Sequence, residues 1–167
     1  MNIVLCGMMG AGKTCVGKAL AKLTGGRFVD TDELIVQKHG AISDIFAKYG
    51  ESYFRDLETQ TAEELSKKDS LIIATGGGFV LRENNVALLK EKGKIVFLQA
   101  SEETLVKRLL TDTTRPLLKG GELSEKIRTL LSTRAPIYGK VADYTVSVDN
   151  KTVEEMAKEI IKTVEGV

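Results

Sequence analysis

The chain has 167 residues, of which 43% are hydrophobic and 28% charged, a balance typical of a folded globular domain rather than a disordered or membrane-spanning protein. Its 24 basic and 23 acidic side chains leave a net charge of +1, which gives no general attraction for nucleic acid or an anionic membrane. We therefore expect one domain over residues 1–167, with no nucleic-acid or membrane partner, and any anion site must be local.

The first residues of the chain, Met1 to Gly7, contain no basic region, and their apolar run is too short for a signal peptide. No later stretch approaches the roughly twenty apolar residues that a bilayer requires. We therefore expect a cytoplasmic protein, and we expect it to act as a monomer.

Short apolar runs alternate with longer segments of helical period along the chain. In chain order the predicted elements are strand 2–6, helix 13–23, strand 27–30, helix 55–66, strand 71–75, helix 84–92, strand 94–99, helices 102–110 and 124–133, strand 144–148 and helix 153–164. Alternation of this kind predicts an α/β fold, a three-layer α/β/α sandwich around a five-stranded parallel sheet.

Cysteine and histidine are scarce. Cys6 and Cys15 have no metal-like spacing, and both stand in apolar surroundings where a reduced, packed thiol is expected. The single histidine, His39, precedes Gly40 at what we interpret as a helix end, so a solvated cap is expected. These observations disfavour histidine-dependent triads and histidine-rich metal sites.

Residues 7–14 read Gly-Met-Met-Gly-Ala-Gly-Lys-Thr and stand between the first strand and the first helix, as in a phosphate-binding loop. Such a loop aims backbone N–H groups and a helix N-terminus at phosphate oxygens. Lys13 would reach the β- and γ-phosphates, and the Thr14 hydroxyl would ligate Mg²⁺. The residues expected to contact the nucleotide here are Gly7, Gly10, Ala11, Gly12, Lys13, Thr14 and Cys15.

Nucleotide binding does not define the chemistry, because GTPases, motor ATPases, nucleotide kinases and metabolite kinases share this loop. A GTPase would need an Asn-Lys-x-Asp guanine reader, and residues 149–152 carry those residue types in the wrong order. The short segments between strands favour a small-molecule kinase.

Two carboxylates, Asp30 and Asp32, follow the second strand at the sheet edge that faces ligands in parallel α/β folds. Strand alternation makes both carboxylates point the same way, so that one can hold a metal-bound water and the other the acceptor hydroxyl. A helix cap at Asp30 or Thr31 is the alternative, and it is compatible with the functional role.

Taken together, short motifs along nearly the whole chain resemble the shikimate kinase family. Each motif is weak by itself, but their order and spacing together are specific. Besides the phosphate loop and Asp30-x-Asp32, they are Phe54-Arg55-Asp56-Leu57-Glu58, Thr75-Gly76-Gly77-Gly78, Arg115-Pro116-Leu117-Leu118, and Arg134-Ala135-Pro136-Ile137-Tyr138 followed by Ala142-Asp143.

The resemblance implies a P-loop NTPase fold of the nucleoside monophosphate kinase type, and transfer of the γ-phosphoryl group of ATP to the 3-hydroxyl of shikimate. It implies an acceptor-binding segment at about 31–60. Asp32 would position or deprotonate the hydroxyl, and Asp30 would serve Mg²⁺ directly or through water. The residues that would bind shikimate are Asp32, Arg55, Gly76, Gly77, Gly78 and Arg134.

On the nucleotide side, the resemblance implies that Arg108 lies near the adenine and that Arg115 is a lid arginine. The sequence departs from the family pattern at Thr14-Cys15, where the family frequently has Ser-Thr or Thr-Thr. Residues 149–152 give no sharp match to its second adenine-side loop.

Residue chemistry supports these roles independently. Only seven of the 24 basic residues are arginines, yet four of them, Arg55, Arg108, Arg115 and Arg134, stand at the positions given a role above. The planar guanidinium suits bidentate capture of a carboxylate or phosphate. The alternatives are a helix ion pair between Arg55 and Glu58, and a simple flexible turn at 76–78 rather than a close backbone approach to ligand.

The least periodic segment, 111–121, contains polar residues, Pro116 and the pair Gly120-Gly121. We interpret it as a lid that brings Arg115 to the transferring phosphoryl group; an inert surface loop is the alternative.

Three other functions remain open. A gluconate kinase would share the phosphate loop but not the Phe-Arg-x-x-Glu and triple-glycine combination, and a nucleoside monophosphate kinase fits less well. A nucleotide-dependent binding module is disfavoured because it would not need the acceptor residues.

Overall fold

The computed structural model describes residues 1–111 and 120–166. Five strands form the sheet: β1 (Asn2–Cys6), β2 (Arg27–Asp30), β3 (Leu71–Ala74), β4 (Gly93–Gln99) and β5 (Tyr144–Ser147). The helices are α1 (Lys13–Thr24), α2 (Thr31–His39), α3 (Ile42–Tyr49), α4 (Glu51–Ser66), α5 (Glu83–Lys90), α6 (Glu102–Leu110), α7 (Gly120–Val141) and α8 (Val153–Glu165), with a 3₁₀ turn η1 at Phe79–Leu81.

The sheet has the strand order β2-β3-β1-β4-β5, and every pairing is parallel. Strand β1 lies at its centre, where Leu5 aligns with Ala74 on one side and Val96 on the other. All five residues of β1 are buried, as expected for a strand covered by helices on both faces. The predicted fold class and all five predicted strands are confirmed.

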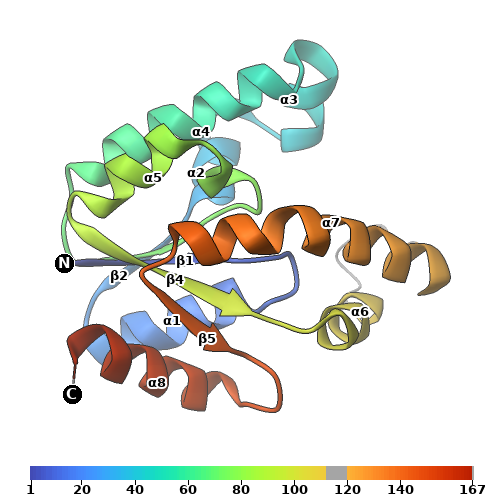
Figure 1. Cartoon of the computed structure of the whole chain (residues 1–167). Helices are drawn as coiled ribbons and strands as arrows, with labels where there is room; N and C mark the ends of the chain where they lie inside the picture. Colours follow the sequence, from blue (N-terminus) through green and yellow to red (C-terminus); the bar gives the residue numbers. More distant parts are fainter. Residues whose placement is uncertain (112–119, 167) are drawn as a thin grey trace.

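Helices cover both faces of the sheet, as Figure 1 shows. Helices α1 and α8 pack together on one face, and α4, α5 and α7 cover the other. Apolar side chains from both layers join the strands in a continuous core that includes Val4, Leu20, Ile95, Tyr138 and Ile160. Among the described residues, none of the helices combines the length and apolar character that crossing a bilayer needs.

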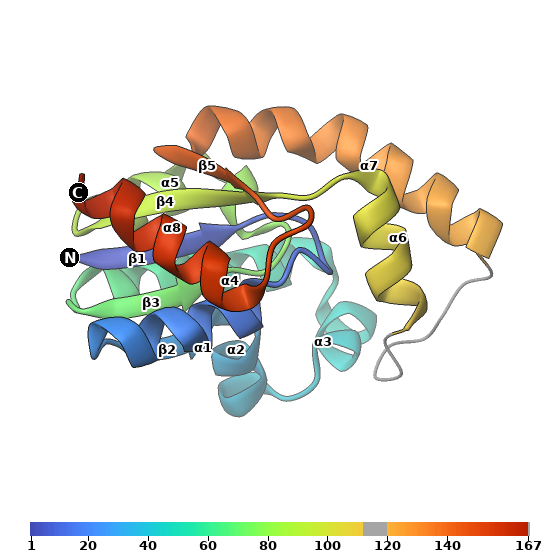
Figure 2. The ribbon, with the colours of Figure 1, turned by 90° about the horizontal axis from the view of Figure 1, so that it is seen from below.

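The carboxyl ends of the strands point away from the two termini. Figure 2 shows α3 and α6 at that end of the molecule, opposite both the N- and C-terminus. Ligands of open parallel sheets bind beyond the carboxyl ends of the strands, where the strand order reverses. The chain runs from β1 outward to both sides of the sheet, so that position lies next to β1.

Two helices were missed by the pattern of apolar residues. Helix α2 has a weakly amphipathic sequence and is fixed at its start by the Asp30 side chain, which accepts hydrogen bonds from the N–H groups of Asp32 and Glu33. It ends at His39 before Gly40, so the predicted helix end at His39 is confirmed. Helix α3 is only eight residues long and therefore gives little periodicity.

Helix α7 is much longer than the predicted 124–133. It continues through Pro136, although proline lacks an N–H group and crowds the preceding turn of a helix. Ala135, Tyr138 and Val141 pack against the core on both sides of this proline. Their burial holds the second half of α7 on the sheet despite the missing hydrogen bond.

Candidate active site

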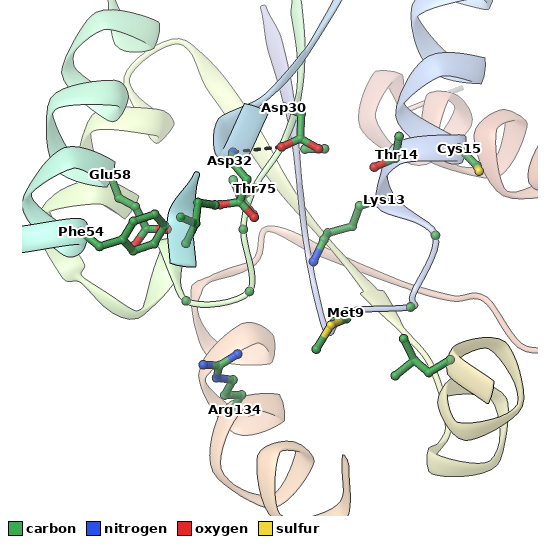
Figure 3. Close-up of a pocket in the computed structure, with 18 of the residues that line it drawn as sticks. Met9, Lys13, Thr14, Cys15, Asp30, Asp32, Phe54, Glu58, Thr75 and Arg134 are labelled. Carbon is green, nitrogen blue, oxygen red and sulfur yellow. Dashed lines mark hydrogen bonds between the residues drawn. The ribbon is translucent and has the colours of Figure 1, made fainter. Parts of the chain in front are cut away.

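A cavity of about 610 Å³ opens at the carboxyl ends of the strands (Figure 3). It is lined by the phosphate loop and start of α1, the end of β2 and start of α2, α4, the glycine turn after β3, α6 and α7. The predicted site residues among these are Gly10, Gly12, Lys13, Thr14, Cys15, Asp30, Asp32, Arg55, Gly76, Gly77, Gly78, Arg108 and Arg134.

The phosphate loop has the backbone shape that its sequence predicts. Gly7, Gly10 and Gly12 all have positive φ angles, of 144°, 90° and 97°. A Cβ atom on Gly7 would also lie 2.8 Å from the Leu98 carbonyl oxygen, so only glycine fits there. Ala11, which does not line the cavity, is fully buried beneath the loop. The N-terminus of α1 begins directly after Gly12 and adds its partial positive charge to this end of the cavity.

Lys13 and Thr14 open α1 and face the cavity. The Lys13 amino group donates hydrogen bonds to the carbonyl oxygens of Gly7 and Met8, so the lysine folds back over its own loop. Figure 3 shows this amino group in the space between the loop and the segment that carries Asp30 and Asp32. Lys13 therefore places a positive charge where both sides of the cavity meet.

The two cysteines differ from the prediction in one respect. Cys6 is fully buried in β1, and burial raises the pKa of its thiol to about 12, as fits a packed, unreactive cysteine. Cys15 was predicted to be packed and is instead exposed, because α1 turns this position toward solvent at the edge of the cavity. The apolar residues around it in the sequence point to other faces of the helix.

Asp30 and Asp32 both line the cavity, but not for the predicted reason. The strand ends at Asp30 and the helix begins at Thr31, so strand alternation does not align the two carboxylates. Asp30 caps α2 through its Oδ1, which accepts from Asp32 N at 2.9 Å and Glu33 N at 3.2 Å. The cap alternative is therefore correct, and Asp32 is displayed from the first helical turn.

Arg55 and Glu58 form a close pair on α4. Their Nη1 and Oε1 atoms lie 2.6 Å apart, and Arg55 Nη2 also lies 3.3 Å from Glu51 Oε1. Burial lowers the pKa of Arg55, but hydrogen bonds and charge from Glu58 and Glu51 outweigh it, and the net shift is upward. The ion pair is thus real, and it coexists with a cavity-facing guanidinium that is 18% exposed.

Glu58 itself is 1% exposed and lines the cavity. Burial raises its pKa, and the Arg55 contact offsets this only in part. Within residues 1–111 and 120–166, its Oε2 atom is buried without a hydrogen-bond partner. A buried carboxylate of this kind holds the Arg55 guanidinium in place through Oε1, and its Oε2 can accept a further hydrogen bond.

The glycines of the turn after β3 each face a different side chain of the cavity. A Cβ atom on Gly76 would lie 2.6 Å from Asp32 Oδ1, one on Gly77 would lie 2.9 Å from Arg134 Nη1, and one on Gly78 would overlap Arg55 Nη1. Real Cβ atoms do not approach other atoms this closely. The turn is therefore more than a flexible connection, because its missing side chains make room for the polar residues of the site.

Arg134 and Arg108 approach the cavity from α7 and α6. Figure 3 shows Arg134 extending from α7 into the opening, on the side opposite Asp32 of α2 and Glu58 of α4. Arg108 donates a hydrogen bond from Nη1 to the Gly10 carbonyl at 3.2 Å and so lies against the phosphate loop. Arg115 and most of the predicted lid at 111–121 lie outside the described residues.

Residues 149–152, where no ligand role could be assigned from the sequence, lie beside the start of α6. Asp149 Oδ1 accepts from Ser101 N at 3.2 Å, and hydrogen bonds from Thr104 and Ser101 lower the pKa of this carboxyl. Asn150 has a φ angle of 59°. This loop therefore lies next to the helix that carries Arg108.

Two buried residues that hold the glycine turn of the site, Thr31 and Tyr138, were not predicted from the sequence. Thr31 is fully buried, and its Oγ1 accepts from the Gly76 N–H at 2.9 Å. Tyr138 is fully buried, and its hydroxyl donates to the Gly77 carbonyl at 2.6 Å. Both stood inside motifs, but a side chain that binds backbone far away in the sequence leaves no periodic signal.

The five-stranded parallel sheet, the glycine loop that leads into α1, and the acidic and arginine side chains across the cavity define a class. The molecule is a P-loop kinase of the nucleoside monophosphate kinase-like fold. The chain belongs to the shikimate kinase family, since the family model described as shikimate kinase matches residues 9–165.

Individual relatives agree with this assignment. The chain is 48% identical over 165 residues to shikimate kinase of Thermodesulfovibrio yellowstonii, covering 98% of this chain and 95% of that one. Among solved structures, shikimate kinase from Acinetobacter baumannii in complex with shikimate is 40% identical, with a TM-score of 0.89, covering 99% of this chain and 93% of that one. The enzyme from Bacteroides thetaiotaomicron is 32% identical, with a TM-score of 0.90 and coverage of 99% and 98%.

A gluconokinase from Sinorhizobium meliloti is similar to the chain only in fold. It is 20% identical, with a TM-score of 0.62, over 99% of this chain and 91% of that one. The family assignment makes the chain an ATP-dependent kinase that acts on an alcohol group.

Proposed function

We propose that this protein transfers the γ-phosphoryl group of ATP to the 3-hydroxyl of shikimate, releasing ADP and shikimate 3-phosphate. The observation that carries the proposal is a single cavity in which a phosphate loop faces a group of acidic, arginine and glycine residues. Similarity along nearly the full chain to a protein solved in complex with shikimate supports the acceptor. Such an arrangement brings donor and acceptor together in one cavity.

On the acceptor side, we assign the shikimate carboxylate to the guanidinium groups of Arg55 and Arg134, which can each form paired hydrogen bonds with it. Backbone N–H groups of the turn at 76–78 would bind ring substituents. Asp32 would accept a hydrogen bond from the attacking hydroxyl, orienting it toward the γ-phosphorus and receiving its proton as the bond forms. These residues belong to α2, α4, the turn and α7, with the acceptor-binding segment at about 31–60 contributing two of them.

On the nucleotide side, we assign the phosphates to the N–H groups of the loop and to Lys13, with Arg108 near the adenine. Lys13 would balance negative charge that moves onto the β–γ bridging oxygen as the bond to the γ-phosphorus breaks.

The oxygen donors of the cavity fit Mg²⁺. Thr14 offers a hydroxyl and Asp30 a carboxylate whose Oδ2 takes part in neither cap bond. Magnesium at nucleotide sites is typically held by one or two protein oxygens, phosphates and waters, so this small donor set suffices. Among the described residues, no cluster of three or more acidic, histidine or cysteine side chains forms a dedicated metal cage. When bound, Mg²⁺ would neutralise phosphate charge.

For Arg115, outside the described residues, we propose a role in neutralising the transferring phosphoryl group, with segment 111–121 acting as a lid. Arg115→Ala should then lower kcat far more than it weakens shikimate binding. Steady-state kinetics with shikimate titration decide this, and an unchanged kcat would contradict it.

We also propose that the enzyme works as a cytoplasmic monomer, which size-exclusion chromatography with light scattering and cell fractionation can test.

The decisive experiment is a coupled ADP-release assay with shikimate, gluconate, quinate and nucleoside monophosphates as acceptors, each with and without Mg²⁺. We expect shikimate to give the highest kcat/KM, and we expect activity to require the metal. A higher kcat/KM with gluconate or a nucleotide would overturn the acceptor assignment, and nucleotide binding without transfer to any acceptor would favour a binding module.

A further inference from the structure

The hydroxyl of Tyr138 lies behind the glycine turn, where it connects two parts of the acceptor side. Tyr138 is on α7, fully buried, and packs against Phe97 of β4 with ring centroids 5.3 Å apart. Its hydroxyl donates to the Gly77 carbonyl at 2.6 Å. The ring does not line the cavity, whereas Gly77 and Gly78 do.

The same hydroxyl also meets Arg134, one helical turn earlier on α7. The Arg134 guanidinium lies beside it, since a Cβ atom on Gly77 would lie 2.9 Å from Arg134 Nη1 and 3.7 Å from the Tyr138 hydroxyl oxygen. Burial raises the pKa of Tyr138, and the charge of Arg134 acts in the opposite direction. The spacing of four residues places both side chains on one face of the helix. The hydroxyl therefore lies beside the Arg134 guanidinium while it donates to the Gly77 carbonyl.

The bond to Gly77 has a consequence for the next residue. In a trans peptide the C=O of one residue and the N–H of the next point in opposite directions. Because Tyr138 holds the Gly77 carbonyl, the Gly78 N–H must point away from Tyr138, the side of the turn on which the cavity lies. Three other polar groups of the turn are engaged: Gly76 N with Thr31, Gly76 O with Phe79 N, and Gly78 O with Leu81 N.

We propose that Tyr138 is a positioning residue that aims the Arg134 guanidinium and the Gly78 N–H at the same acceptor. This inference rests on the proposed function for the identity of the acceptor and extends it to a residue that does not touch substrate. Its buried hydroxyl fixes two donors at once, so its removal should weaken acceptor binding selectively. The phosphate loop is built from other segments and should not be affected.

The test is Tyr138→Phe, which keeps the ring and its packing and removes only the oxygen. We expect the Kd and KM for shikimate to rise about five- to tenfold, the size of one or two lost hydrogen bonds, with the KM for ATP changed less than twofold. Tyr144→Phe is the matched control, since Tyr144 lies on neighbouring β5 away from the cavity, and it should leave both constants unchanged.

A second comparison tests whether Tyr138 acts through Arg134. In an Arg134→Lys background, Tyr138→Phe should raise the shikimate Kd by a smaller factor than in the wild type, because part of its action passes through Arg134. Full additivity, an unchanged shikimate Kd in Tyr138→Phe, or equal losses for shikimate and ATP would each overturn the proposal.

A measurement on the wild type keeps the proposal testable even if the variant fails to fold. In amide NMR spectra, shikimate should shift the Gly78 resonance more than that of Gly76, whose N–H is held by Thr31; an unmoved Gly78 resonance would overturn the proposal.

If the wild type proves inactive with shikimate, the proposed function fails separately. The same selective loss must then appear with whichever acceptor the wild type uses, and its absence would overturn the role of Tyr138.

Discussion

The two sides of the cavity are built in different ways. The nucleotide side is mainly backbone from one continuous segment, in which three glycines with positive φ and the start of α1 shape the loop. The acceptor side is mainly side chains, brought together from α2, α4 and α7 around the glycine turn after β3. A contiguous backbone site depends on local conformation, whereas a dispersed site depends on how separate helices pack.

This difference predicts different responses to mutation. On the proposed nucleotide side, we expect the charge of one residue, Lys13, to matter most. On the proposed acceptor side, Arg55 is paired with Glu58, and Arg134 lies beside the Tyr138 hydroxyl. Changes there should therefore be smaller and should separate the acceptor constants from the nucleotide constants.

The largest expected effect is that of Lys13→Ala. We expect kcat to fall about a thousandfold, because the positive charge on the transferring phosphates is lost while the buried core is untouched. Steady-state kinetics and circular dichroism measure this, and Lys18→Ala, an exposed lysine on the same helix, is the control. A well-folded Lys13→Ala variant with near-normal kcat would remove Lys13 from the chemistry.

Asp32→Asn should have the next largest effect, a fall in kcat of about a hundredfold, because the amide cannot accept the proton of the attacking hydroxyl. Thermal stability should change little, since the cap of α2 is formed by Asp30. Glu33→Gln, in the same helical turn, is the control and should retain activity. If both variants lose activity equally, the first turn of α2 matters for folding rather than for catalysis.

Arg134→Lys should raise the KM for shikimate roughly tenfold to a hundredfold, the cost of a lost charge-assisted hydrogen bond, and should leave the KM for ATP nearly unchanged. Arg128→Lys is the control, because Arg128 lies on the same helix, is largely exposed and pairs with Glu102. Selective loss of ATP binding instead would assign Arg134 to the nucleotide side and so weaken the contrast between the two sides.

The smallest effect concerns stability and pH. Burial raises the pKa of Glu58 in the folded protein above its ordinary 4.5, so its contribution to stability is fully present below pH 4.5 and is lost as pH rises through the folded value. Glu58→Gln has no such group, so its free energy of unfolding should increase relative to that of the wild type from pH 4.5 to pH 7.5. Urea denaturation at the two pH values measures this. A constant difference would show that Arg55 fully compensates burial.

What could be predicted from the sequence also differs between the two sides of the cavity. The strands and the phosphate loop are local features, and the sequence predicts both. Asp30 and Asp32 were placed in the cavity by a wrong alternation, because the cap that ends β2 and begins α2 depends on a side chain rather than on periodicity. The second half of α7 was missed because its stability comes from burial around Pro136, which propensity opposes.

The hydrogen bonds that hold the glycine turn beside the acceptor residues could not be predicted from the sequence. Thr31 and Tyr138 bind glycine backbone 45 and 61 positions away in the sequence. Contacts of this length exist only once the sheet has brought β2, β3 and α7 together.

The three glycines after β3 have a consequence for how this site can vary. Gly76, Gly77 and Gly78 each leave empty the volume that Asp32, Arg134 and Arg55 occupy, so each glycine and its facing side chain share one space. An alanine at Gly78 therefore competes with Arg55 for room, and a shorter residue at position 55 should relieve that conflict while abandoning the guanidinium. Each conflict involves the end of a flexible side chain, so a substitution in this turn should displace the facing carboxylate or guanidinium and thereby change how the site meets its acceptor.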